Sequence, residues 1–284
     1  MKVSIITSCY NREATIRDAI RSVTEQTYPD IEYIVIDGAS TDGSLDIIRS
    51  EEARVSSPEF AAAHPRFRML VVSEPDHGMY EAINKGIRMA TGDYVGLVHS
   101  DDFLFSPQTV GHIVERLAAT HADFLYGDGL FVNPENTEQV VRKWIGGTYR
   151  LWKVRHGWLP LHPTCYVRRE VMERRGLYNE SYRIAADSDL LFRYLLGGDI
   201  TVTYLPEYIV RMRMGGMSTD SAKRRQMWKE DIRMYHSHGM NATVTKIEKM
   251  MWKVPQFVMP RTVGDVGDEL LALAFGVAQQ PIDG

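Results

Sequence analysis

The chain contains very little cysteine: two residues among 284, Cys9 and Cys165. Two cysteines cannot form the disulfide framework of a small secreted domain, and their spacing fits no metal-binding motif. Both lie among apolar or small residues, which is typical of buried free thiols. The sequence therefore argues against a disulfide-rich protein and against a cysteine-ligated metal centre.

Long apolar runs and a strong charge of one sign are also missing. No apolar stretch approaches the length of a transmembrane helix, and the N-terminal residues are too few and too polar for a signal peptide. The net charge is −4, so no global positive excess points to nucleic acid. Hydrophobic residues make up 44% and charged residues 25%, as in ordinary globular proteins. We expect a cytoplasmic protein with one large domain or two moderate ones.

The charge is nevertheless uneven along the chain. Between Ser221 and Thr262, nine Lys or Arg residues stand against three acidic ones, giving +6, so the remainder carries −10. Within this segment, Val244 to Val254 combines apolar and aromatic residues with three lysines. Such a pattern is typical of a helix that binds an anionic membrane surface. The alternatives are a helix packed on the domain and a helix packed on a second subunit, as in a homodimer.

The first hundred residues alternate between short apolar segments and amphipathic helical segments. The expected strands are residues 2–9, 31–36, 68–73 and 94–98. Between them, apolar residues recur at helical spacing, for example at Ile16, Ile20 and Val23. The alternation predicts an α/β fold with a mostly parallel, doubly wound sheet and helices on both faces.

The second half follows a looser pattern. We expect helices over residues 107–120 and 187–196, a strand within residues 122–132, and a strand over Ile200–Leu205. Residues 51–66 show no clear period and predict a helix end followed by a loop.

Polar side chains follow each of the four expected strands. They are the segment from Thr7 to Asn11, then Asp37, then Asp76, and finally the pair Asp101 and Asp102. Because right-handed crossovers bring the carboxyl ends of parallel strands to one edge, we expect these groups to share a ligand site. Two adjacent carboxylates repel each other unless a cation is near, and a hard divalent ion prefers oxygen ligands. The pair predicts a metal–diphosphate site; the alternative is a turn with helix capping.

Several segments, in order along the chain, resemble the motifs of one known family. They are Val3–Arg12, Ser22–Glu32, Ile36–Gly43, Asn84–Gly86, Ala90–Tyr94, Ser100–Asp102 and Ile184–Leu190. In these motifs the chain resembles the family-two glycosyltransferases, which have the GT-A fold. The resemblance implies transfer of a sugar from a nucleotide-diphosphate donor, expected to be a UDP-sugar, to an acceptor hydroxyl with inversion at the anomeric carbon.

The resemblance also assigns roles by motif position. Asp187 would be the general base, with Asp189 as the alternate, and Asp102 would ligate Mg²⁺ or Mn²⁺. The residues implied to bind the donor are Thr7, Tyr10, Asn11, Asp37, Asp76, Lys85 and Asp101. Thr7 and Tyr10 would face the nucleobase. Asp37 would accept a hydrogen bond from the base, and Asp101 would contact the ribose.

The acceptor side is less defined by the motifs. Trp158 and His162 are the candidates there, with a core position as the alternative for Trp158. One position departs from the family: where Asp-x-Asp is frequent, His99 takes the first place and Ser100–Asp102 retains the rest. We expect His99 either to pack under the sheet end or to donate a supporting hydrogen bond.

The sequence thus predicts a metal-dependent inverting glycosyltransferase, a hexosyl- or N-acetylhexosaminyl-transferase acting in the assembly of a surface polysaccharide or glycolipid. The expected domains are a catalytic domain over residues 1–206, divided into a nucleotide-binding half (1–103) and an acceptor-binding half (104–206), and a basic helical extension over residues 207–284. The expected partners are a nucleotide-sugar donor, a saccharide or lipid-linked acceptor and, through the extension, the inner face of the cell membrane.

The sequence leaves one alternative function open and disfavours another. A nucleotide-sugar-binding scaffold without activity, on the same fold, is the alternative to an enzyme. A Rossmann oxidoreductase is disfavoured, because Cys9-Tyr10-Asn11-Arg12 stands where a G-x-G-x-x-G motif would follow the first strand.

Overall fold

The structure is a computed structural model that describes residues 1–215 and 224–252. The strands are β1 (Val3–Cys9), β2 (Ile31–Asp37), β3 (Arg68–Ser73), β4 (Tyr94–Leu97), β5 (Asp102–Leu104), β6 (Phe124–Val132), β7 (Val140–Trp144), β8 (Tyr166–Arg168) and β9 (Val202–Arg213). The helices are α1 (Ile16–Thr24), α2 (Ser44–Val55), α3 (Pro58–Ala63), α4 (Met79–Met89), α5 (Thr109–Thr120), α6 (Leu151–Arg155), a 3-10 turn (His162–Thr164), α7 (Arg169–Arg175), α8 (Ala186–Leu195), α9 (Arg224–Ser237) and α10 (Ala242–Met251).

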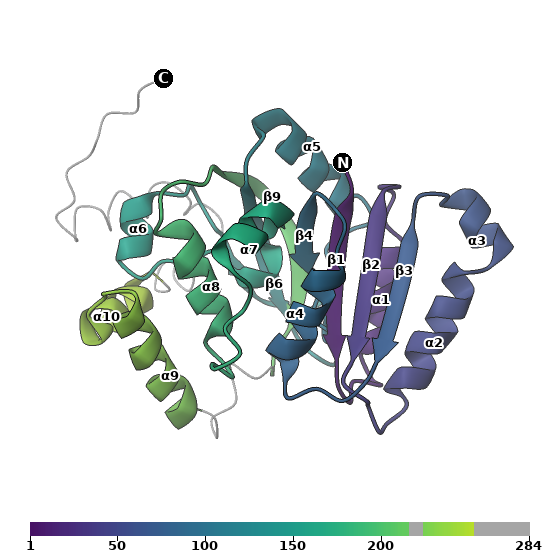
Figure 1. Ribbon diagram of the computed structural model, residues 1–284, viewed down its shortest axis with the longest axis horizontal. Coiled ribbons are helices and arrows are strands. Elements are labelled where there is room, and N and C mark those ends of the chain that lie inside the picture. The colour runs from purple at the N-terminus through teal and green to yellow at the C-terminus, as the bar shows by residue number, and fades with distance from the viewer. Residues whose placement is uncertain (216–223, 253–284) are drawn as a thin grey trace.

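The strands form one mixed sheet in the order β3-β2-β1-β4-β8-β6-β9-β5, with β7 paired to β6. Helices cover both of its faces, and one apolar core lies on each side (Figure 1). The predicted α/β fold with helices on both faces is confirmed.

The N-terminal half of the sheet is parallel. β1 lies between β2 and β4, and β2 pairs with β3. β1 and β2 are buried along their whole length, which explains their nearly continuous apolar sequences. On one face α4 packs through Tyr80 and Ile83, and on the other α1 packs through Ile16 and Ile20. The carboxyl ends of these four strands lie at one edge of the sheet, as predicted.

Residues 51–66 differ from the prediction. α2 continues to Val55, and a second helix, α3, follows where we expected a loop. Ser57 caps α3 by accepting a hydrogen bond from the backbone N–H of Phe60 (3.2 Å), and Pro58 occupies its first turn. Proline suits this position because its fixed φ is helical and its missing N–H would have no helical partner. A local Ser-Pro cap, not an apolar period, therefore starts this helix.

The C-terminal half of the sheet is mixed. β8 is antiparallel to β4 and β6, β9 is parallel to β6, and β5 is antiparallel to β9. The strand predicted over Ile200–Leu205 was too short, because β9 continues to Arg213. It passes Pro206 and Glu207 through a bulge that leaves both without a partner on β6. The distal part of β9 then pairs with Asp102 in β5.

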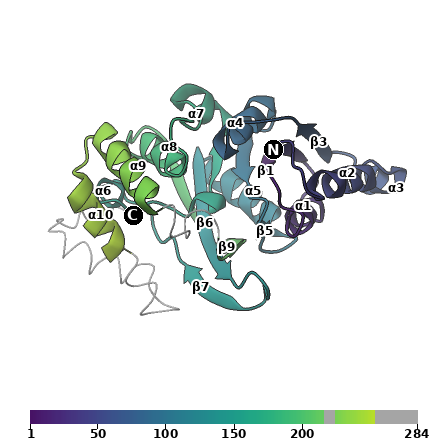
Figure 2. The same ribbon diagram turned by 90° about the horizontal axis from the view of Figure 1, so that it is seen from below.

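The helices α9 and α10 pack on the domain beside α6 and α8 (Figures 1 and 2). Met234, Tyr235, Ala242 and Trp252 are buried in the same core as α8, so packing on the domain is confirmed for residues 224–252. Of the predicted extension, residues 216–223 and 253–284 lie outside the described residues. The division expected between residues 206 and 207 falls within β9 and stays a prediction. No helix of the described ranges is long and apolar enough to cross a membrane.

Candidate active site

The loops after β1 and β2 are joined at the carboxyl edge of the sheet. The backbone N–H of Asn11 donates to Ser40 Oγ (2.9 Å), and Asn11 Oδ1 accepts from the backbone N–H of Thr41 (2.8 Å). Asn11 and Ala39 have φ values of 52° and 59°, in the left-handed region. Such strain persists where surrounding contacts hold the backbone, and it clusters at ligand sites. Asn11 therefore shapes this edge and has its side chain bound within it.

Asp37 lies at the same edge and is fully buried. Its carboxylate accepts hydrogen bonds from the backbone N–H of Ser40 (3.1 Å), from Ser40 Oγ (2.5 Å) and from Ser73 Oγ (2.7 Å). A carboxylate has roughly four acceptor positions, so about one is left for a ligand. Asp37 therefore joins the ends of β2 and β3, and a ligand would share it with these donors.

Thr7 and Tyr10 occupy different environments. Thr7 is fully buried, and its Oγ1 donates to the carbonyl of Val98 (2.7 Å) and lies 3.0 Å from Tyr33 Oη. It ties β1 to the end of β4 and does not reach the surface of the edge. The side chain of Tyr10, in contrast, is 56% exposed. Of the two, only Tyr10 is open to a ligand.

Asp76 and Lys85 follow β3. Asp76 Oδ1 accepts from the backbone N–H of Gly78 (2.9 Å), and a Cβ added at Gly38 would come within 2.5 Å of Asp76 Oδ2. A side chain at position 38 would therefore displace the Asp76 carboxylate, and Asp76 lies beside the loop after β2. Lys85 forms an ion pair with Glu74.

The carboxylates of Asp101 and Asp102 differ sharply in environment. Asp102 begins β5, is 3% exposed, and accepts a hydrogen bond at Oδ1 from the backbone N–H of Arg213 (3.1 Å). Burial raises the pKa of Asp102 well above its usual range, and the charge of Asp101 acts in the same direction. Asp101 is partly exposed, and its carbonyl accepts from the Arg213 guanidinium (2.9 Å). β9 thus holds the pair, and Asp101 is its accessible member.

The pair fits a divalent cation in part. Its adjacent carboxylate oxygens suit Mg²⁺ or Mn²⁺, and a cation would offset the repulsion between the two charges. Within residues 1–215 and 224–252, however, no group of three or more His, Cys, Asp or Glu side chains is placed to hold a metal ion. The residues therefore fit a cation that takes one or two protein oxygens and its other ligands from phosphates and water.

His99 and His162 stack in the site, with ring centroids 6.2 Å apart and planes 28° from parallel. His162 Nε2 lies 2.7 Å from Tyr178 Oη. Burial lowers the pKa of His99, and it lowers the pKa of His162 to about 4. Both imidazoles are therefore neutral near pH 7. The negative charges of Asp101 and Asp187 oppose this lowering of the pKa at His99.

Asp187 stands in the first turn of α8 and is partly exposed. Its Oδ1 accepts a hydrogen bond from Tyr80 Oη (3.3 Å), and the same hydroxyl donates to the carbonyl of Ile184 (3.0 Å). The charge of Asp187 opposes the lowering of the pKa at both His99 and His162. Tyr80 also stacks on Tyr178, with ring centroids 5.6 Å apart, and Tyr178 contacts His162. Asp187 is thus linked to His162 through these two tyrosines.

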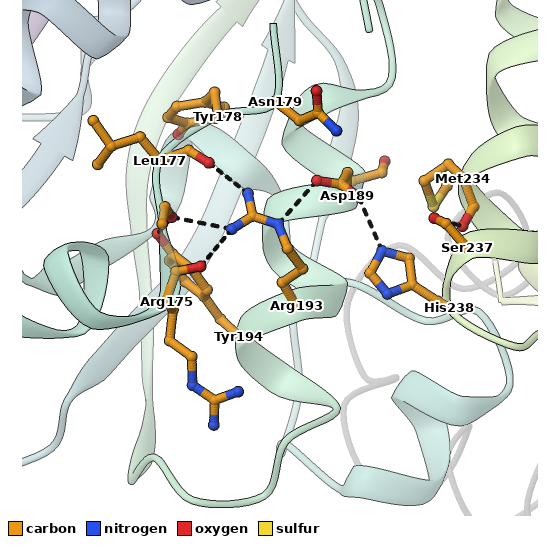
Figure 3. Close-up of polar contacts among 12 residues, drawn as sticks. Arg175, Leu177, Tyr178, Asn179, Asp189, Arg193, Tyr194, Met234, Ser237 and His238 are labelled. Carbon is orange, nitrogen blue, oxygen red and sulfur yellow. Dashed lines mark hydrogen bonds and ion pairs between the residues drawn. The ribbon is translucent and has the colours of Figure 1, made fainter. Parts of the chain in front are cut away.

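Asp189 lies about 200° around α8 from Asp187. It is 4% exposed; its Oδ2 lies 3.0 Å from Arg193 Nε and its Oδ1 lies 3.0 Å from His238 Nε2 (Figure 3). Although burial raises the pKa of Asp189, hydrogen bonds from His238 and Arg193 lower it overall. Arg193 also donates to the carbonyls of residues 175, 176 and 177. Both oxygens of Asp189 are thus occupied by structural partners.

Trp158 belongs to the core. Its side chain is 6% exposed, and its ring packs edge-on against Tyr126 with centroids 5.7 Å apart. The structure thus places Trp158 in the core, the alternative position, and its role on the acceptor side stays a prediction.

Three residues at the site were not predicted from the sequence. Tyr80 lies on α4, Arg213 lies beyond the predicted end of its strand, and Glu230 lies in the basic helical extension. All three act through contacts with residues more than 40 positions away, for which the sequence holds no local signal.

Comparison with known proteins identifies the class of protein. Residues 4–177 match glycosyl transferase family 2. A PGL/p-HBAD biosynthesis glycosyltransferase of Mycobacterium bovis is 27% identical over 217 residues, covering 76% of this chain and 78% of the relative. An uncharacterized glycosyltransferase of Mycobacterium tuberculosis is 31% identical over 202 residues, covering 68% of this chain and 69% of the relative.

Solved structures agree with this fold. S. aureus TarS 1–349 in complex with UDP-GlcNAc superimposes with a TM-score of 0.63 at 17% identity, covering 98% of this chain and 79% of that one. Of a longer TarS chain only 43% is covered. The mannosyltransferase PcManGT from Pyrobaculum calidifontis, in complex with GDP-Man and Mn²⁺, gives a TM-score of 0.61 at 19% identity, covering 99% and 76%. The protein is thus a glycosyltransferase with the GT-A fold. The chain belongs to glycosyl transferase family 2.

Proposed function

We propose that the protein transfers a sugar from a nucleotide-diphosphate sugar to a hydroxyl group of a saccharide or glycolipid, with inversion at the anomeric carbon. The observation that carries this proposal is the environment of Asp187, which is partly exposed and is oriented by Tyr80, while both oxygens of Asp189 are occupied by structural partners. Inversion by a single displacement needs one base, on the face opposite the leaving group. Asp187 supplies that base.

The relatives support the choice of substrates. TarS was solved with UDP-GlcNAc, which supports a UDP-sugar as donor, and the M. bovis relative is named for PGL/p-HBAD biosynthesis, which supports a glycolipid acceptor. PcManGT was solved with Mn²⁺, which supports a divalent cation.

The donor binds along the edge formed by the ends of β1, β2 and β4. Tyr10 offers an exposed ring for the nucleobase, and Asp37 has an acceptor position left for its N–H group. We assign the cation to Asp101 rather than Asp102, because Asp102 is 3% exposed and already accepts from Arg213. When bound, such a cation offsets the negative charge of the departing nucleotide diphosphate.

Asp187 accepts the proton of the acceptor hydroxyl as the hydroxyl oxygen bonds to the anomeric carbon. The bond between that carbon and the diphosphate oxygen breaks, and its electron pair leaves with the nucleotide diphosphate. Tyr80 donates to Asp187 and orients it. Burial keeps His162 neutral, so it can form a hydrogen bond with the acceptor substrate. A neutral imidazole carries no positive charge that would attract the phosphates of the donor.

The test is release of nucleotide diphosphate from a panel of UDP- and GDP-sugars with Mn²⁺ or Mg²⁺, with and without glycolipid acceptors. We expect acceptor-dependent release from at least one donor, and a product whose anomeric configuration, read by NMR, is inverted. Donor binding by calorimetry without transfer from any donor would instead support the scaffold alternative. Retained configuration would exclude Asp187 as the sole base.

A further inference from the structure

Glu230 of α9 binds the loop that leads into α8. Its Oε2 accepts hydrogen bonds from three consecutive backbone N–H groups: those of Arg183 (3.0 Å), Ile184 (2.8 Å) and Ala185 (3.1 Å). Gln226, one turn earlier on α9, donates to Glu230 Oε1 (2.9 Å). A single carboxylate thus fixes three successive residues of a loop that lies 45 to 47 positions away in sequence.

The start of α8 has no other cap of this kind. The residue at its N-cap position is Ala185, which offers no side-chain hydrogen bond. The first N–H groups of a helix have no partner within the helix and favour a negative charge nearby. Glu230 places such a charge beside the start of α8, although the three N–H groups that it binds directly precede the first helical residue. Although burial raises the pKa of Glu230, the hydrogen bonds from Gln226 and from the loop N–H groups lower it, so it is ionised near pH 7.

The same loop is held from its other side by α4. Tyr80 donates both to the carbonyl of Ile184 and to Oδ1 of Asp187. Ile184 therefore has its N–H bound by Glu230 and its carbonyl bound by Tyr80, three residues before Asp187. The backbone that sets the position of Asp187 is clamped between α4 and α9.

Other contacts of α9 reinforce this arrangement. Arg233 donates to the carbonyl and to Oγ of Ser181, at the beginning of the loop, and its guanidinium lies 4.1 Å from the ring centre of Tyr182. His238, the residue directly after α9, binds Asp189 on α8. α9 and the residue that follows it therefore contact the loop before α8 and the first turn of α8.

We propose that Glu230 is a positioning residue for sugar transfer: it fixes residues 183–185 and thereby holds Asp187 at the acceptor hydroxyl. This inference rests on the proposed role of Asp187 as the base. It assigns a catalytic purpose to α9, which lies outside the residues that match the family (4–177).

The test compares four variants in the full chain, two at Glu230 and two controls. Glu230→Ala removes the carboxylate, and Glu230→Gln keeps an acceptor oxygen but removes the charge. Trp252→Leu is the docking control: Trp252 is buried against Trp152 (5.7 Å between ring centroids) at the end of α10, so its loss weakens packing of α10 without touching the loop. Glu115→Ala, at an exposed position of α5, is the matched acidic control.

Three quantities are measured: kcat and donor KM with the sugar nucleotide that the wild type uses, thermal unfolding, and amide hydrogen exchange of the peptide covering residues 183–187. For Glu230→Ala we expect kcat to fall about 10- to 100-fold, because a small misplacement of a base is costly, with donor KM within about twofold. Glu230→Gln should recover part of the loss. Exchange in residues 183–187 should rise for Glu230→Ala and stay unchanged for Glu115→Ala.

Two results would overturn the inference. One is a Glu230→Ala variant whose kcat, per folded molecule, equals that of the wild type. The other is a Trp252→Leu variant that loses as much kcat as Glu230→Ala, because docking of the helices alone would then explain the effect. Failure of the proposed function looks different: the wild type itself would transfer no sugar, while the exchange measurement would still report whether Glu230 holds the loop.

Discussion

The hydroxyl of Tyr80 lies 3.3 Å from Oδ1 of Asp187, so a residue on α4 donates directly to the carboxylate at the start of α8. Burial and the charge of Asp187 raise the pKa of Tyr80 well above its ordinary value, so the hydroxyl is protonated at neutral pH and acts as the donor. Tyr80→Phe removes this donor and keeps the ring. We expect kcat to fall about tenfold, as for loss of one hydrogen bond to a charged group, with donor KM nearly unchanged in steady-state assays.

The matched control is Tyr94→Phe. Tyr94 is also buried (1% exposed, against 6% for Tyr80), and its hydroxyl donates to the carbonyl of Ala122 (2.7 Å), outside the site. Each variant removes one buried hydroxyl, and that of Tyr80 is shared between Ile184 and Asp187. Both stabilities should therefore fall, while only Tyr80→Phe loses kcat. Equal kcat in the two variants would show that Tyr80 does not orient Asp187.

The two carboxylates of α8 should separate in mutagenesis. Asp187→Asn removes the base and should abolish transfer, with the melting temperature and donor affinity close to wild type. Asp189→Asn leaves Arg193 and His238 without their buried anion and should cost about 2–4 kcal/mol of unfolding free energy, while the folded fraction keeps activity. Activity per folded molecule and chemical denaturation measure the two effects. Near-normal turnover of Asp187→Asn would move the base elsewhere.

The sequence left this choice open for a physical reason. Asp187 and Asp189 both stand in the first turn of one helix, and the motif position favoured Asp187. The only local signal that separates them is Arg193, four residues after Asp189, with which it forms an ion pair. The second partner of Asp189 is His238, 49 positions away, which only the fold brings to it. The parallel half of the sheet was predictable because strands buried on both faces read as apolar runs. The full length of β9 was not predictable, because the strand continues beyond Pro206 through a bulge.

Asp101 and Asp102 should differ in their effect on metal dependence. We expect EDTA to abolish transfer and Mn²⁺ or Mg²⁺ to restore it. Asp101→Asn should raise the Mn²⁺ concentration needed for half-maximal activity at least about tenfold, because Asp101 is the accessible carboxylate. Asp102→Asn keeps an acceptor for the Arg213 N–H and should change this concentration little. A larger effect of Asp102→Asn than of Asp101→Asn would support Asp102 as the metal ligand. Activity that survives EDTA would show that transfer does not need a metal ion.

The outer face of α9 and α10 is the surface at which the expected membrane contact can be tested. Trp228, Val244, Ile247 and Met250 are all about half exposed or more, and Lys246 lies over the Trp228 ring. If this face binds anionic membranes, the double variant Ile247→Glu/Met250→Glu should lose most flotation with vesicles that contain an anionic phospholipid. Val141→Glu, at an exposed apolar position on β7, is the control. Equal flotation of the two variants, or none by the wild type, would count against the contact.

Glu32 should make the stability depend on acid pH. It is 4% exposed and accepts from Lys2 Nζ (2.8 Å), Ser4 Oγ (2.6 Å) and both the N–H and Oγ1 of Thr91 (2.7 Å each). Burial raises the pKa of Glu32, but these hydrogen bonds outweigh burial and lower the pKa from 4.5 to about 2. A carboxylate with a lowered folded-state pKa stabilises the protein above its unfolded pKa, and that contribution is lost as the pH falls from about 4.5 to about 2.

Glu32→Gln removes this contribution at all pH values. We expect it to lower the unfolding free energy by about 3 kcal/mol at pH 7 and by progressively less as the pH falls below about 4.5, so that the two curves converge toward acid pH. Urea denaturation at pH 7, 5, 4 and 3 measures the difference, with Glu115→Gln, at an exposed position, as the control. A difference between wild type and Glu32→Gln that stays constant with pH would show that the carboxylate is not selectively stabilised in its ionised form.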